Sequence, residues 1–129
     1  MQESPIFTRT HDMLLWLAQA TRKFPREYRF TLAQRTLNQA FTFQDALIAA
    51  SIDATRVADH LLRADIALTG LRKTLLICLD LQLLDNGQYR HVSGLTAETG
   101  RLLGGWQRTA KDKAARPNHR VSDGGTGPG

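Results

Sequence analysis

The apolar residues recur along the chain at intervals of three and four positions, which is the spacing of one helix face. No stretch alternates between apolar and polar residues in the manner of a half-buried strand. The spacing predicts four helices, over residues 8–23, 26–50, 56–84 and 88–110. Since helices joined by short connections pack beside their sequence neighbours, we expect an all-α fold, an up-down-up-down antiparallel four-helix bundle.

The first two predicted helices each carry a broad apolar face. Thr8 or Thr10 is the expected N-cap of the first helix. The buried face of this helix comprises Met13, Leu14, Trp16, Leu17, Ala20 and Phe24. Pro25 separates the two helices, because a proline is tolerated at a helix start, where its missing N–H would have no partner. The expected buried face of the second helix comprises Phe30, Ala33, Leu37, Ala40, Phe41, Leu47 and Ile48.

The third predicted helix has the most regular pattern. Its apolar positions alternate in steps of four and three, which is the heptad seam of long, nearly parallel or antiparallel helices. These positions are Val57, Leu61, Ala64, Leu68, Leu71, Leu75 and Cys78. Asp53 or Thr55 is the expected cap at its start, and residues 85–87 are expected to end it, with Gly87 in the left-handed closing position.

The fourth predicted helix combines an apolar face with four glycines. Val92, Leu95, Leu102, Leu103 and Trp106 share the face. A glycine within a helix costs about 1 kcal/mol relative to alanine. Two interpretations stay open for these glycines: close approach of another backbone, or a bent or frayed helix. The four positions are Gly94, Gly100, Gly104 and Gly105.

Length and composition indicate one domain with extensions at both ends. We expect an N-terminal extension over residues 1–7, the bundle over 8–110, and a basic, glycine-rich, disordered tail over 111–129. The single cysteine, Cys78, allows no internal disulfide. No secretory signal and no run of about 18 apolar residues is visible, so we expect a cytoplasmic protein that does not insert into a membrane.

The chain is basic, with a net charge of +5 and a pI near 10.0. Residues 86–129 hold seven basic and three acidic residues, so most of the excess is C-terminal. Clustered cations on an exposed surface suit a polyanionic partner, although a solvated surface charge is the alternative at each single position. No aromatic residue is expected among them, so stacking on bases is not predicted. The candidate binding residues are Arg22, Lys23, Arg26, Arg29, Arg35, Arg72, Lys73, Arg101, Arg108, Lys111 and Lys113.

The sequence offers no convincing catalytic or metal-binding constellation. The histidines are scattered, Cys78 lies in the predicted seam, and no phosphate-binding loop is present, so we expect no metal, cofactor or enzymatic activity. One enzyme class stays open as an alternative. Ribonucleases of the HEPN kind use an Arg and a His four to six residues apart, whereas Arg56 and His60 have only three residues between them.

Four segments together resemble a known family. They are residues 14–17 (LLWL), 23–35 (KFPREYRFTLAQR), 79–84 (LDLQLL) and 100–106 (GRLLGGW). Their order and separation resemble the accessory variability determinant (Avd) of diversity-generating retroelements. They resemble more loosely the four-helix proteins encoded in intervening sequences of 23S ribosomal RNA genes. The similarity covers roughly residues 8–110.

The resemblance implies a function that the residue patterns alone do not. It implies that the chain assembles into a homopentameric barrel. It also implies a non-enzymatic accessory subunit that binds the retroelement reverse transcriptase together with template RNA and DNA. Such a protein supports mutagenic copying and retrohoming through basic surfaces. It also implies a buried Trp106, with Arg101 and Arg108 facing outward. The alternatives are an RNA- or ribosome-associated interaction protein of the intervening-sequence family and, further off, a HEPN-type ribonuclease.

Overall fold

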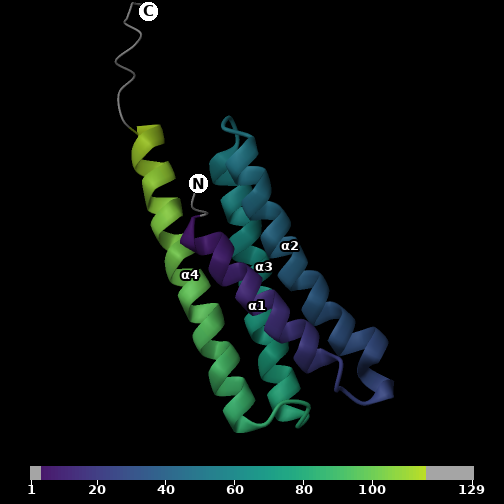
Figure 1. Cartoon of the computed structure of the whole chain (residues 1–129). Helices are drawn as coiled ribbons and strands as arrows, with labels where there is room; N and C mark the ends of the chain where they lie inside the picture. Colours follow the sequence, from purple (N-terminus) through teal and green to yellow (C-terminus); the bar gives the residue numbers. More distant parts are fainter. Residues whose placement is uncertain (1–3, 116–129) are drawn as a thin grey trace, which may run out of the picture.

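The computed structural model describes residues 4–115, and every element of secondary structure within them is a helix (Figure 1). This confirms the all-α, four-helix prediction. Two short turns of unusual helix, η1 and η2, link the first helix to the second. The elements in order are α1 (Pro5–Thr21), η1 (Arg26–Tyr28), η2 (Arg29–Ala33), α2 (Gln34–Ile52), α3 (Val57–Asp80) and α4 (Asn86–Ala115).

The four long helices alternate in direction and close into a ring (Figure 1). Each packs against its neighbours in sequence, and α1 also packs against α4, with α2 against α3 the most extensive pair. The α1–α2 connection therefore lies at the same end of the bundle as the α3–α4 connection. The α2–α3 turn and the end of α4 lie at the other end.

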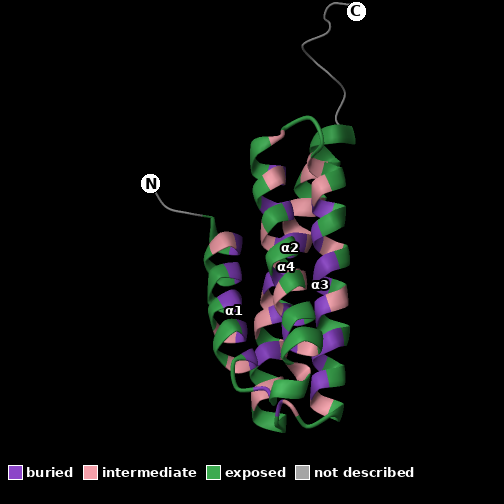
Figure 2. Ribbon diagram, turned by 90° about the vertical axis from the view of Figure 1, so that its right-hand side faces the viewer, coloured by how far each residue is buried: buried purple, intermediate pink, exposed green. Residues whose placement is uncertain are grey.

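The core lies on the sides of the helices that face one another (Figure 2). The heptad seam of α3 is confirmed, since its members from Leu61 to Cys78 are buried and only Val57 is half-buried. Met13, Phe43 and Leu103 fill the space opposite from the other three helices. Burying side chains of this size stabilises the fold by about 1.5–3 kcal/mol each.

Six threonines also lie in the core, which the apolar pattern did not indicate. Thr10, Thr21 and Thr36 each donate their hydroxyl to the carbonyl four residues earlier, at 2.7 Å. This bond satisfies a buried hydroxyl within its own helix, so the residue needs no polar partner from a neighbouring helix. The other three are Thr74, Thr96 and Thr99.

The start of α1 corrects the predicted cap. The helix begins at Pro5, three residues before the predicted start, with Ser4 in the capping position and no side-chain cap bond. Proline suits this first position because the N–H that it lacks would be unpaired there. Thr8 is exposed and Thr10 is buried in the core, so neither caps the helix.

The beginning of the second helical segment was also predicted wrongly. The chain forms a 3₁₀ turn and then a π-helical turn before regular α-helix starts at Gln34. The wider π turn gives its own residues a different angular position from that in a regular α-helix. Phe30 lies within this turn and is 79% exposed. Phe41 and Ile48, on the regular helix beyond it, lie beside the buried ridge and are 48% and 40% exposed.

The end of α3 differs from the prediction as well. The helix stops at Asp80, and the left-handed residue is Gln82, with φ of 61°, rather than Gly87. The amide of Gln82 donates to the Leu79 carbonyl at 2.9 Å, and the amide of Leu83 donates to the Cys78 carbonyl at 2.8 Å. These two bonds close the helix in a Schellman motif. The early reversal brings Leu84 into the core at 2% exposure.

Asp85 starts α4. Its Oδ1 accepts from the Gln88 amide at 2.7 Å, and the Gln88 side chain accepts from the Asp85 amide at 2.9 Å. This reciprocal capping box contributes about 1 kcal/mol. Gly87 lies in the first turn of the helix that it was expected to precede.

The glycines of α4 neither break the helix nor admit another backbone of the described chain. The helix is continuous to Ala115, five residues past its predicted end, so residues 111–115 belong to α4 rather than to the tail. A Cβ at Gly94 would meet nothing, and one at Gly100 would make an ordinary contact with Leu68. The remainder of the predicted tail, 116–129, and residues 1–3 of the predicted extension lie outside the described residues.

We expect Gln82→Gly to stabilise the protein by about 1 kcal/mol, because glycine adopts the left-handed conformation without the Cβ penalty. Urea denaturation followed by circular dichroism measures this as a higher midpoint. The matched control is Gln19→Gly in the last turn of α1, where the same change should destabilise by about 0.5–1 kcal/mol. A lowered urea midpoint for the Gln82 variant would contradict the left-handed conformation of residue 82.

Candidate nucleic-acid interface

All eleven predicted binding residues are exposed, but they form separate groups on the bundle. One group surrounds the connection from α1 to α2, a second lies on α3, a third follows α4, and Arg35 stands by itself on α2. Because α4 runs away from the α1–α2 connection, Lys111 and Lys113 lie at the opposite end of the bundle (Figure 1). The cations therefore do not make one continuous patch.

The group around the first connection is the densest, and we call Arg22, Lys23, Arg26 and Arg29 the basic corner. Phe24 is buried and anchors this corner to the core. The amides of Phe24 and Tyr28 donate to the carbonyls of Thr21 and Pro25 at 3.0 and 2.9 Å. The four cations are thus held on an ordered backbone, and Glu27 is the single acidic residue among positions 22–29.

Two of the corner residues border a groove of about 580 Å³ between α1 and α2, which we call the α1–α2 groove. Arg22 and Arg29 lie at its edge, and Leu37 and the exposed Phe30 and Phe41 contribute apolar surface. No aspartate or glutamate lines it. The expectation that no aromatic residue lies among the cations is therefore wrong.

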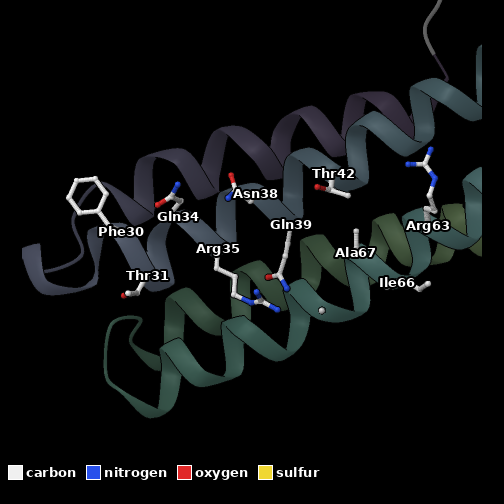
Figure 3. Close-up of a pocket in the computed structure, with 11 residues that line it drawn as sticks. Phe30, Thr31, Gln34, Arg35, Asn38, Gln39, Thr42, Arg63, Ile66 and Ala67 are labelled. Carbon is white, nitrogen blue, oxygen red and sulfur yellow. The ribbon is translucent and has the colours of Figure 1, made fainter.

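A second groove, of about 700 Å³, runs between α2 and α3 and is shown in Figure 3. Arg35 lines it, together with Arg63, which the sequence analysis did not select. The one feature of the sequence that could have pointed to Arg63 is its position one helical turn after His60. The remaining lining is rich in amides and hydroxyls, and again contains no acidic side chain: Thr31, Gln34, Asn38, Gln39 and Thr42.

The predicted pair on α3 lies apart from both grooves. Arg72 and Lys73 border a small hollow on the outer face of α3, between Thr69 and Leu76. The surrounding surface of α3 is apolar, with Ile66 64% exposed. The pair therefore interrupts an apolar face rather than extending the basic corner.

Arg101 and Arg108 face outward on α4, but their charges differ in availability. Arg101 holds both oxygens of Glu98, at 2.8 and 3.1 Å. The hydrogen bonds from Arg101 lower the pKa of Glu98, and the same contact raises the pKa of Arg101. Arg108 instead lies along the open backbone of Gly104 and Gly105. Of the two, Arg108 is the freer cation.

Trp106 is half-buried rather than buried. Its ring packs edge-on against Phe7, with 6.3 Å between the ring centroids. Phe7 belongs to α1, in the segment that was expected to be an extension. Trp106 thus closes the bundle against the start of α1, whereas Gly104 and Gly105 beside it face only Arg108 of their own helix.

A polar network fixes the turn between α2 and α3. Asp53 Oδ1 accepts from the Thr55 hydroxyl and amide at 2.6 and 3.1 Å, and Asp53 Oδ2 lies 3.1 Å from His60 Nε2. Because a guanidinium can only donate, Arg63 donates to His60 Nδ1 at 2.8 Å, and His60 Nε2 is the atom that donates to Asp53. The expected cap at Asp53 or Thr55 is not formed, because Arg56 occupies the N-cap position and the two side chains bond to each other and to His60.

This network bears on the ribonuclease alternative. Both ring nitrogens of His60 are occupied, and Arg56 turns to Asp59, at 3.6 Å. The two residues that such an enzyme would need are therefore engaged with different partners. Cys78 is no better placed as a nucleophile, since burial raises the pKa of its thiol.

Over residues 4–115, no group of three or more histidine, cysteine, aspartate or glutamate side chains is placed to hold a metal ion. Across the same range, no helix combines the length and apolar character needed to cross a membrane.

The fold and the surface define a four-helix-bundle protein with an exposed cationic corner. Residues 6–110 match the family model described as bAvd-like, which is most of the chain. The chain therefore belongs to the bAvd-like family, and the resemblance to accessory variability determinants is confirmed. A comparison with curated proteins found no match.

We expect the Asp53 network to stabilise the fold in a pH-dependent way. The hydrogen bond from the Thr55 side chain, followed by that from His60, lowers the pKa of Asp53 from its usual 3.8 to about 2. A carboxylate whose pKa is lowered in the folded state adds stability above its unfolded pKa, and this is lost as the pH falls toward the folded value.

The variant Asp53→Asn should therefore be less stable than the parent at neutral pH. The difference should shrink as the pH falls from about 4 to about 2. Urea midpoints across this range give the measurement, with Asp45→Asn, an exposed position on α2, as the control. A difference that is independent of pH would show that the charge of Asp53 is not what stabilises the turn.

Proposed function

We propose that this chain is a non-catalytic accessory subunit of a diversity-generating retroelement. In this role it binds the retroelement's reverse transcriptase and its template RNA and cDNA, and it supports mutagenic copying and retrohoming. The observation that carries the proposal is the bAvd-like match over residues 6–110, since this is a family of accessory rather than catalytic proteins.

The basic corner and the two grooves support the nucleic-acid part of the proposal. Arginine and lysine side chains neutralise phosphates without reading sequence, and the released counterions make such binding strongly dependent on salt. Arg22 and Arg29 border one groove, and Arg35 and Arg63 border the other. With no acidic side chain lining either groove, a polyanion meets two cations in each groove and no repulsion from the lining.

An outer face of α3 supports self-association into a homopentameric barrel. Leu62, Ile66, Thr69, Lys73 and Leu76 are spaced 4-3-4-3 and exposed, so α3 carries a second heptad stripe outside the core. A heptad stripe is the surface with which one helix packs along another. Three of these five positions are apolar, and exposed apolar side chains gathered on one face are uncommon on monomeric proteins.

We expect the double variant Arg22→Glu, Arg29→Glu to bind RNA at least about tenfold more weakly at low salt, because two charge-assisted contacts are lost and two repulsions are added. Its plot of log affinity against log salt should also be shallower by about 1.4, the contribution of two phosphate contacts on a single strand. Fluorescence anisotropy with a labelled RNA provides both quantities.

The control is Arg9→Glu with Arg56→Glu, which changes the net charge equally. Both positions are exposed and only weakly paired, with Asp12 and Asp59. If the two double variants lose affinity to the same extent, net charge rather than the basic corner determines binding.

We expect the wild-type chain to have a mass in solution near five times the 14.4 kDa of one copy, measured by light scattering. Ile66→Glu should lower this mass while the helical circular dichroism persists, because a charge on the outer stripe opposes apolar contact without touching the core. Ile52→Glu is the control, at an isoleucine on α2 that is more exposed than Ile66, 77% against 64%. A wild-type mass of one copy refutes the barrel.

A further inference from the structure

Phe30 is the most exposed large apolar side chain among residues 4–115, at 79%. It stands on the π-helical turn η2, at the edge of both grooves, next to Arg29. π-Helical turns are rare and occur often at functional sites. An aromatic ring that is exposed to water beside arginines does not contribute to the core. Its position is suited to contacts with a bound ligand.

Phe30 belongs to a stripe that continues along α2. Phe30, Gln34, Leu37 and Phe41 are spaced 4-3-4, and all four line the α1–α2 groove. The helical rise places the two phenylalanines roughly 16 Å apart along the groove. Arg22 and Arg29 contribute cations to the same groove. The two aromatic rings therefore flank an amide and an aliphatic side chain, beside two cations.

We propose that the α1–α2 groove binds single-stranded nucleic acid, with unpaired bases stacking on Phe30 and Phe41 and phosphates contacting Arg22 and Arg29. This inference rests on the proposed function and specifies its ligand. Stacking requires a base whose face is free, which a duplex does not offer away from its ends. Every base has such a face, so the groove discriminates by strandedness rather than by sequence.

The second groove extends this path. Phe30 lies at the end of a row of side chains that Figure 3 shows along α2. Arg35 and Arg63 follow along that groove, together with the amides of Gln34 and Asn38. A strand that crosses Phe30 therefore meets cations and hydrogen-bonding side chains on both sides of the ring.

The charge distribution favours this ligand over an apolar protein surface. An apolar partner covering Phe30 and Phe41 would desolvate Arg22 and Arg29 without supplying a counter-charge, which is unfavourable. A phosphodiester backbone provides one negative charge per nucleotide beside each stacked base. The groove lining, which contains no acidic side chain, matches that pattern.

The test measures fluorescence anisotropy of the full chain with labelled oligouridine and with an RNA duplex of equal length. The variants are Phe30→Leu, which keeps an apolar side chain but cannot stack, and Phe30→Trp, which stacks better. Ile52→Ala is the control, because Ile52 is similarly exposed, at 77%, and lies at the other end of α2. Position 30 is 79% exposed, so neither substitution removes a core contact, and circular dichroism verifies the fold.

We expect Phe30→Leu to weaken oligouridine binding at least about fivefold, with the salt dependence unchanged because no phosphate contact is lost. Duplex binding and the Ile52→Ala variant should match the parent. Phe30→Trp should retain affinity, and its indole fluorescence should be quenched by oligouridine.

The outcomes separate this inference from the proposed function. If the parent binds RNA and Phe30→Leu leaves both affinities unchanged, the stacking surface is refuted while the accessory role stands. The inference is also overturned if Phe30→Leu lowers the mass of the assembly instead, which would assign the stripe to contacts between copies. If the parent binds neither RNA at low salt, the proposed function fails and the inference with it.

Discussion

Burial of the heptad seam of α3 is the interaction on which the rest of the structure depends. α3 packs against both α2 and α4, so its inward residues contribute to the two sides of the ring at once. Leu61, Leu68, Leu71 and Leu75 supply an almost continuous apolar ridge. Once this ridge is covered, the directions of α2 and α4 are set, and α1 closes the remaining side through Met13 and Leu17.

The connections follow from the same requirement. The chain leaves α3 through the left-handed Gln82 because this reversal places Leu84 in the core, and the Asp85 capping box then starts α4. At the same end of the bundle, Phe24 anchors the α1–α2 connection. The neighbours of Phe24 are consequently turned outward. Core packing thus determines where the basic corner lies. Its positive charge comes from the residue types in the sequence.

Some features of the candidate site could be predicted from the sequence, and others depend on how the helices pack. Exposure of the arginines could be expected, because a guanidinium is rarely buried without a partner. The pairing of Arg101 with Glu98 follows from their spacing of three on one helix. Arg35 and Arg63 come from different helices, so their shared groove required the packing of α2 on α3. Phe30 was placed in the core by hydrophobicity alone, which ignores the direction that the π turn imposes.

The amino-acid sequence by itself determined the helical class, the number of long helices, the inward seam of α3 and the cationic character of the surface. These follow from local periodicity and charge, which tertiary contacts do not change. Tertiary structure alone decided which apolar residues stay outside, which threonines enter the core, and which cations share a groove. The physical reason is that each of these outcomes depends on the angle and distance between helices. Neighbouring helices compete for the same interior volume, and no single helix carries that information.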